Sequence, residues 1–116
     1  MSKVSIVLKK DFSFDAAHYL PKHPGKCREM HGHTWTGTIT CAGNSDLLQD
    51  GILVDFGKIK EVVKQLDHTT LNKLPQFKHA PPTAENIAAW LLQEIPYAIQ
   101  VDLNETPGNK VIVTHV

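Results

Sequence analysis

The chain has 116 residues and is expected to form one domain, residues 1–116, because domains commonly run to ~100–200 residues. Its 12 basic and 12 acidic residues cancel, which argues against the basic surface that nucleic acid or an anionic membrane would require as a partner. Residues 1–12 contain too short an apolar run for a signal peptide, and no stretch is apolar enough to span a bilayer, so we expect a cytoplasmic protein.

Strict alternation of apolar and polar residues predicts two strands in the amino-terminal part of the chain. In the first strand the apolar residues share one parity: Val4, Ile6, Leu8, Phe12 and Phe14. A loop follows from residue 15 to about residue 30, and alternation resumes from residue 31 to residue 42. There Trp35, Ile39 and Cys41 lie on one parity and four threonines on the other, which suits a strand. Gly43-Asn44 predicts a turn.

The period then becomes helical in two segments. Asp55 can cap the first helix, whose apolar stripe is Phe56, Ile59, Val62, Val63 and Leu66. The second helix is expected to begin after Pro81-Pro82 with Thr83 as its cap and to end at Pro96; its stripe is Ile87, Ala88, Leu91, Leu92 and Ile95.

A strand, a turn and a strand complete the chain. Residues 99–105 alternate, Pro107-Gly108-Asn109 predicts the turn, and residues 110–116 are rich in valine and isoleucine. The predicted element order is therefore ββααββ. This order is typical of an α+β fold in which two helices pack on one face of an antiparallel sheet.

Three histidines predict a metal site. His31 and His33 flank Gly32 on a predicted strand, so their imidazoles project from the same face. His18 follows the first strand directly, and pairing of the two strands as a hairpin would bring it close to both. Three histidines leave one position of a zinc ion open, as in catalytic sites. The alternative is ordinary strand polarity for the H-x-H pair and a loop position without a partner for His18.

Four further residues are candidates for chemistry or binding. Cys27 precedes His31 by four residues and could act as a base or nucleophile near a metal, whereas an inert buried thiol is the alternative. Asp67 could orient and charge the imidazole of His68 for proton transfer, although the pair also suits a solvated helix end. Glu105 shares its parity with apolar residues, so it could enter a pocket and accept two hydrogen bonds from a planar ligand; otherwise it begins the exposed turn. For Cys41 we expect the inert role.

Six short segments follow one another along nearly the whole chain. They are FDAAH at residues 14–18, CREMHGH at 27–33, VDFGKIK at 54–60, LDHTTLN at 66–72, PTAENIA at 82–88 and ETP at 105–107. In this order and at these intervals they resemble the 6-pyruvoyl-tetrahydropterin synthase family, in particular its bacterial 6-carboxytetrahydropterin synthase branch.

The resemblance implies roles for the candidate residues. It makes His18, His31 and His33 zinc ligands, Cys27 the general base, Asp67 and His68 its proton-relay partners, and Glu105 the anchor of the pterin ring. It also implies a subunit whose sheets join into a barrel around a tunnel in a trimer, the tunnelling fold. Two such trimers stack into a homohexamer with active sites between subunits.

The activity that the resemblance implies is a lyase reaction of queuosine biosynthesis. Dihydroneopterin triphosphate would be converted to 6-carboxytetrahydropterin with loss of acetaldehyde and triphosphate, and zinc would act as a Lewis acid. Glu29 departs from the simplest pattern, because some family members use a glutamate in place of the cysteine and release 6-hydroxymethyl-dihydropterin. The same motifs would also suit a synthase that forms pyruvoyl-tetrahydropterin, or a non-catalytic zinc or pterin binding protein; retention of Cys27, Asp67 and His68 argues against the latter.

Overall fold

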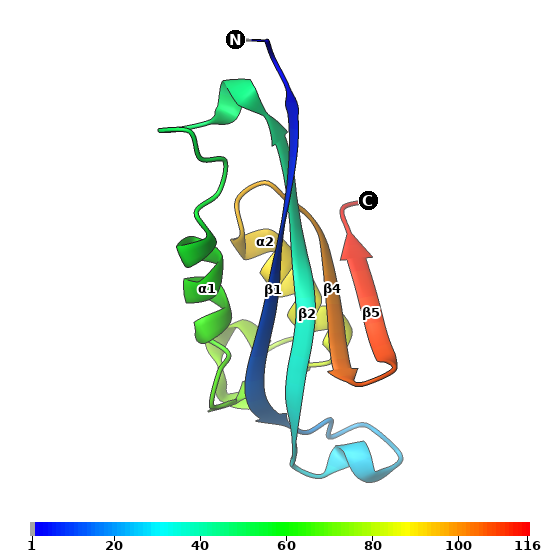
Figure 1. The fold of residues 1–116 in the computed structure, drawn as a ribbon. Coiled ribbons are helices and arrows are strands. Elements are labelled where there is room, and N and C mark those ends of the chain that lie inside the picture. The colour runs from blue at the N-terminus through cyan, green and yellow to red at the C-terminus, as the bar shows by residue number, and fades with distance from the viewer. Residues whose placement is uncertain (1) are drawn as a thin grey trace.

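The computed structural model describes residues 2–116, and its framework is a sheet covered by two helices (Figure 1). The strands are β1 (Ser5–His18), β2 (His31–Asn44), β3 (Thr69–Thr70), β4 (Ala98–Thr106) and β5 (Asn109–Thr114). The helices are α1 (Phe56–Lys64) and α2 (Ala84–Glu94), and single 3₁₀ turns span Lys26–Arg28, Ser45–Leu47, Leu71–Lys73 and Pro75–Phe77. The α+β class and the order of the four long strands and two helices are as the sequence predicts.

The sheet is mixed, so the prediction of a purely antiparallel sheet is wrong. Its strand order is β3-β1-β2-β4-β5, and the four long strands pair antiparallel with their neighbours. β3, however, runs parallel to the end of β1, where Ala16 and Ala17 pair with Thr69 and Thr70. Two residues are too few to produce an alternating pattern, which is why this strand leaves no signal in the sequence.

One face of the sheet and both helices enclose the core. Trp35, Ile39 and Cys41 of β2 have no exposed surface, and neither do Val101 and Leu103 of β4. Figure 1 shows α1 and α2 on the same side of the sheet, with α1 along β1 and α2 behind the middle strands. Both predicted helix stripes are buried against this face apart from one residue. The exception is Phe56, which is 51% exposed because it is the first residue of α1.

Both helices begin at the predicted caps. The Asp55 carboxylate accepts a hydrogen bond of 2.7 Å from the backbone N–H of Gly57, and the Thr83 hydroxyl accepts one of 3.1 Å from Asn86. Each bond satisfies an N–H group that has no partner within the helix. The second cap fixes where α2 starts and hence the position of the preceding residue, Pro82.

Two bulges interrupt the regular pairing of β4. The register shifts between Thr40 and Cys41 of β2, so Ala98 rather than Ile99 faces the core and Ile99 is 43% exposed. A second shift, between Asn104 and Thr106, contains Glu105. Bulges re-aim the side chains that they carry, and the predicted uninterrupted alternation of β4 is therefore wrong at Ile99.

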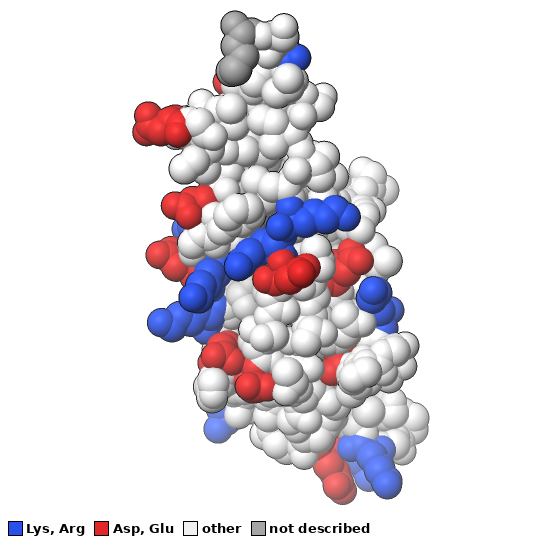
Figure 2. Space-filling view, viewed as in Figure 1, with Lys and Arg blue, Asp and Glu red and all other residues white. Residues whose placement is uncertain are grey.

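The molecule is elongated, with extents of 57 × 25 × 22 Å, because the β1–β2 ribbon projects beyond the helices (Figure 1). Apolar side chains near its far end are partly exposed, among them Val4, Val7 and Ile52 at 50–61%. On the face in Figure 2, acidic side chains lie beside and within an oblique band of lysine and arginine, so this face has no uniform positive field. Among residues 2–116 no helix is long and apolar enough to cross a membrane.

Candidate active site

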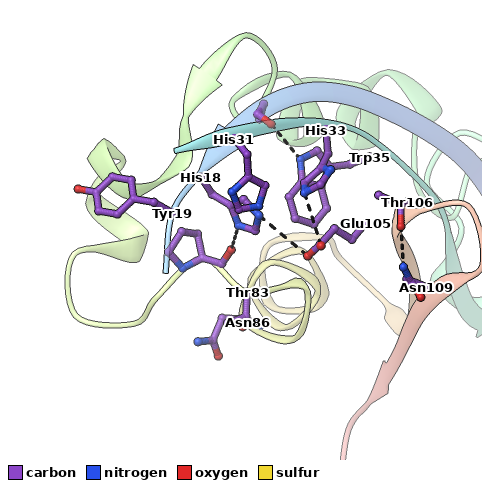
Figure 3. A network of polar contacts seen from close by, with 12 residues as sticks. His18, Tyr19, His31, His33, Trp35, Thr83, Asn86, Glu105, Thr106 and Asn109 are labelled. Atoms are coloured by element: carbon purple, nitrogen blue, oxygen red, sulfur yellow. Dashed lines mark hydrogen bonds and ion pairs between the residues drawn. The ribbon is translucent and has the colours of Figure 1, made fainter. Parts of the chain in front are cut away.

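Three histidines converge at the end of the β1–β2 hairpin. His18 of β1 lies directly opposite His31 of β2, and His33 lies opposite Ala16. All three side chains therefore project from the same face of the sheet, the one that the helices cover. Their ring centroids are 4.5, 4.8 and 5.4 Å apart. Figure 3 shows the three rings pointing toward the start of α2, with Glu105 beside them.

Backbone carbonyls orient two of the rings. Nδ1 of His18 lies 2.7 Å from the carbonyl oxygen of Pro82, and Nδ1 of His31 lies 2.7 Å from that of Glu29. A carbonyl only accepts, so each Nδ1 carries the proton and each Nε2 retains a free lone pair. A hydrogen bond from the second ring nitrogen to a backbone carbonyl is the arrangement that metal-binding histidines adopt.

The free nitrogens share one small space. One ring nitrogen from each of His18, His31 and His33 lies within 4.8 Å of the others. Nε2 of His18 and Nε2 of His33 are buried and have no hydrogen-bond partner among the described residues. An unsatisfied buried polar atom is unfavourable, and a metal ion between the rings would satisfy both.

Burial also keeps these rings in the form that binds metals. Desolvation lowers the pKa of His18, which has no exposed surface, and it lowers the pKa of His33. The nearby Glu105 carboxylate opposes this effect in both. The neutral imidazole is the metal ligand. Three imidazoles whose free nitrogens converge fit a zinc ion with one further coordination position.

The indole ring of Trp35 packs against two imidazoles of the histidine cluster. Its ring meets His18 edge to face at 5.0 Å and His33 at 5.5 Å. Its indole N–H donates a hydrogen bond of 3.2 Å to the carbonyl of Ala16, so the ring has one fixed orientation. Packing against this ring restricts the rotamers of both imidazoles.

Glu105 lies at the rim of the histidine cluster. One carboxylate oxygen is 3.5 Å from Nε2 of His33 and the other is 4.0 Å from Nε2 of His18. The side chain is 30% exposed, so it borders both the cluster and solvent.

A separate cavity of about 450 Å³ is lined by Pro82 together with Tyr19 and Phe77.

Asp67 and His68 form a second polar cluster with Asp15. Nδ1 of His68 lies 2.8 Å from the Asp67 carboxylate, and the other oxygen of that carboxylate accepts a 2.9 Å hydrogen bond from the backbone N–H of Asp15. The backbone N–H of His68, which has φ +57°, donates 2.6 Å to the carbonyl of Asp15. The Asp15 N–H and the His68 ring hold the pKa of Asp67 below its usual 3.8. The pair is therefore oriented by a backbone segment of β1.

The two clusters lie on opposite faces of the β1–β2 ribbon. Asp15 pairs with Thr34, whose hydroxyl donates a hydrogen bond of 2.6 Å to the Asp15 carboxylate. Because side chains alternate along each strand, Asp15 and Thr34 point to the face opposite to that of His18 and His33. An open hollow on that face is lined by small residues, including Ala17 and Gly32, together with His68. His33 also borders this hollow, but Asp67 and His68 cluster with Asp15 and not with the three histidines.

The two cysteines occupy different surroundings. Cys27 is partly buried in the 3₁₀ turn Lys26–Arg28 of the loop that joins β1 to β2. Its carbonyl accepts a 2.8 Å hydrogen bond from Leu20, which closes the loop at the histidine end of the ribbon. Cys41 lies in the core, and burial raises the pKa of its thiol, as an inert role requires.

Four residues that contact the two clusters are not among the functional candidates predicted from the sequence. Trp35 and the carbonyl of Pro82 contact the histidine cluster, whereas Asp15 and Thr34 belong to the hydrogen bonds of the second cluster. Alternation marks Trp35 only as a core residue. Asp15 has one available signal, its position three residues before His18 inside FDAAH. A backbone carbonyl such as that of Pro82 leaves no signal in the sequence, because every residue has one.

Comparison with known proteins identifies the family. The chain is 39% identical to a 6-carboxy-5,6,7,8-tetrahydropterin synthase from Synechocystis sp., over 79% of this chain and 76% of that protein. It is also 39% identical to a dihydroneopterin monophosphate aldolase from Pyrococcus furiosus, over 72% of this chain and 68% of that protein. The structure of Caenorhabditis elegans 6-pyruvoyl tetrahydropterin synthase superposes with a TM-score of 0.79 at 25% identity, covering 97% of each chain. Residues 7–115 match the 6-pyruvoyl tetrahydropterin synthase family as a whole, and the chain belongs to that family.

Proposed function

We propose that the chain is a zinc-dependent 6-carboxy-5,6,7,8-tetrahydropterin synthase that converts 7,8-dihydroneopterin triphosphate with loss of acetaldehyde and triphosphate, a lyase step of queuosine biosynthesis. The observation that supports this most is the convergence of the Nε2 atoms of His18, His31 and His33, two of them buried and without a partner. The name carried by several relatives supports the choice of product.

His18, His31 and His33 would hold the zinc ion, which when bound supplies a Lewis acid that acidifies a C–H bond of the substrate side chain. Cys27 is the base that removes that proton. The loop containing Cys27 ends at His31, so the thiol and the metal ligands approach the substrate from the same end of the ribbon. Glu105, at the rim of the cluster, accepts hydrogen bonds from the N–H groups of the pterin edge.

Asp67 and His68 serve a site in a neighbouring subunit. Their place on the face opposite to the histidines prevents them from meeting the metal ligands of their own chain. An added Cβ at Gly32 would meet no atom within 4 Å, so this face of the chain has room for another subunit. β5 and most of β1 have an unpaired edge, which strand pairing between subunits would protect. We therefore propose a barrel of three subunits and a hexamer of two such trimers.

A second candidate activity is side-chain cleavage to 6-hydroxymethyl-dihydropterin. The observation that favours it is the Pyrococcus furiosus relative, named an aldolase, whose identity equals that of the Synechocystis relative. Glu29 lies in the same loop as Cys27 and would supply the alternative base. Its side chain is exposed, however, whereas Cys27 is partly buried, and this difference favours the thiol as the base.

Product identification separates the two activities. The zinc-loaded protein is incubated with dihydroneopterin triphosphate and, separately, with the monophosphate, and the pterin products are identified by mass spectrometry. We expect 6-carboxytetrahydropterin and acetaldehyde from the triphosphate. A 6-hydroxymethyl product as the main species would transfer the assignment to the aldolase. A protein that binds zinc and pterin without turnover of either substrate would be a binding protein.

A further inference from the structure

The carboxylate of Glu105 is aimed at the same point as the histidine nitrogens. Its two oxygens lie 3.5 Å from Nε2 of His33 and 4.0 Å from Nε2 of His18 (Figure 3). Hydrogen bonds between nitrogen and oxygen measure about 2.7–3.2 Å, and neither ring nitrogen has a hydrogen-bond partner among the described residues. The carboxylate therefore lies within ion-pair distance of both rings but beyond the usual hydrogen-bond distance.

These separations suit groups that share a metal ion. Zinc binds histidine nitrogen and carboxylate oxygen at about 2.0–2.2 Å, so two ligands of a tetrahedral ion lie about 3.3–3.6 Å apart. The 3.5 Å between Glu105 and His33 falls inside this range, and the 4.0 Å to His18 lies slightly outside it. A small rotation of a side chain that is 30% exposed would close the second distance.

Charge favours the same arrangement. Imidazole ligands bring no negative charge, so three of them leave both positive charges of a zinc ion uncompensated, next to a histidine with no exposed surface. A buried charge is unfavourable unless it is paired. Among residues 2–116, Glu105 is the acid whose carboxylate lies within 4 Å of these ring nitrogens. Glu105 has the same parity along β4 as Val101 and Leu103, which face the core, so its side chain projects from the face of the sheet that carries the histidines.

We propose that Glu105 is the fourth metal ligand of the resting enzyme and that it leaves the metal to bind the N–H edge of the incoming pterin. This proposal rests on the proposed function, and it gives the Glu105 carboxylate two successive partners: first the metal ion and then the pterin. Pterin recognition and the opening of a coordination position then become one event, so the metal is exposed as a Lewis acid only when a pterin is present. An open fourth position at rest, as the sequence suggests, is replaced by a carboxylate that the substrate displaces.

The test compares metal binding by the wild type and by Glu105→Gln. Glu85→Gln is the matched control, because Glu85 loses the same charge at the exposed start of α2, close to Pro82 but without contact to the histidines. Zinc affinity is measured by competition with a chromogenic chelator. We expect Glu105→Gln to weaken zinc binding at least tenfold, since even residues behind the direct ligands contribute roughly 10–100-fold. Glu85→Gln should bind zinc as the wild type does.

The visible spectrum of the Co²⁺-substituted protein reports the ligand exchange directly. The spectrum of the wild type should change when neopterin is added, whereas that of Glu105→Gln should already differ from the wild type before addition. Equal zinc affinity and identical Co²⁺ spectra for wild type and Glu105→Gln would overturn the proposal. That result leaves the proposed function intact, which fails instead if the wild type does not bind zinc or forms a different product.

Discussion

Removal of the metal ion should destabilise the folded chain by an amount that the structure allows us to work out. Without metal, Nε2 of His18 and Nε2 of His33 are buried and have no hydrogen-bond partner among the described residues, although the Glu105 carboxylate lies 4.0 and 3.5 Å from them. Each unsatisfied buried polar group costs about 1–3 kcal/mol, so the two together cost about 2–6 kcal/mol. One kcal/mol shifts Tm by roughly 4–8 °C in domains of 60–100 residues and roughly 2–4 °C in domains of 150–250 residues. For a chain of intermediate length the shift is about 4 °C per kcal/mol, so zinc removal should lower Tm by about 8–24 °C.

Calorimetry of zinc-loaded and chelator-stripped protein at one fixed concentration measures this shift, because association of subunits also raises Tm. His33→Ala removes one of the two nitrogens and a ligand, so its Tm should respond little to zinc. His79→Ala, at an exposed position, should respond as the wild type does. If stripped and loaded wild type melt within about 2 °C of each other while metal analysis shows that zinc has gone, the reasoning from the two unpartnered nitrogens is refuted.

Four further experiments address the base, the relay and the assembly. Cys27→Ala should lower the rate of 6-carboxytetrahydropterin formation about 10²–10⁴-fold with zinc content unchanged, while Glu29→Gln should retain that rate; the reverse pattern in a product assay would make Glu29 the base. Mixed hexamers of Cys27→Ala and Asp67→Asn subunits should be more active than either variant alone, because some sites then combine the intact Cys27 of one chain with the intact Asp67 of its neighbour; no recovery would place both residues in one chain's site. The pKa of Asp67 is held below 3.8, so its contribution to folding is complete at higher pH and is lost as pH falls through the folded-state pKa; the unfolding free energies of wild type and Asp67→Asn in urea should converge over that range. Ile112→Lys, at a 57% exposed position of the edge strand β5, should give smaller particles in sedimentation velocity, and an unchanged sedimentation coefficient would argue against strand pairing there.

Most of the framework could be predicted because its signals are local. Residues two apart on a strand share a face, so alternation alone places Trp35, Ile39 and Cys41 in the core and His31 beside His33. The caps Asp55 and Thr83 are readable because an N-cap bonds to an N–H two or three residues away. Where the determining contact lies within a few residues, the sequence predicts the structure.

The remaining features depend on contacts between distant segments. The register shifts around Ile99 and Glu105 arise from the pairing of β4 with strands that lie elsewhere in the chain, and alternation within β4 does not reveal them. The carbonyl of Pro82 reaches His18 across 64 positions, and Asp67 reaches the backbone of Asp15 across 52. Backbone groups have no residue-specific signal, so a sequence cannot report such partners.

The separation of the two polar clusters explains why the sequence suggests one site although a single chain holds two parts of it. The motifs FDAAH and LDHTTLN meet where β1 pairs with β3, so the same strand end presents His18 on one face and the backbone that orients Asp67 and His68 on the other. Side chains alternate along β1, so Asp15, which belongs to the second cluster, points away from the face that carries His18. We therefore propose that each set works with its counterpart from another copy of the chain. Under this proposal, the association that protects the edges of β5 and β1 would also complete the site. A monomer would then bind zinc without catalysing the reaction.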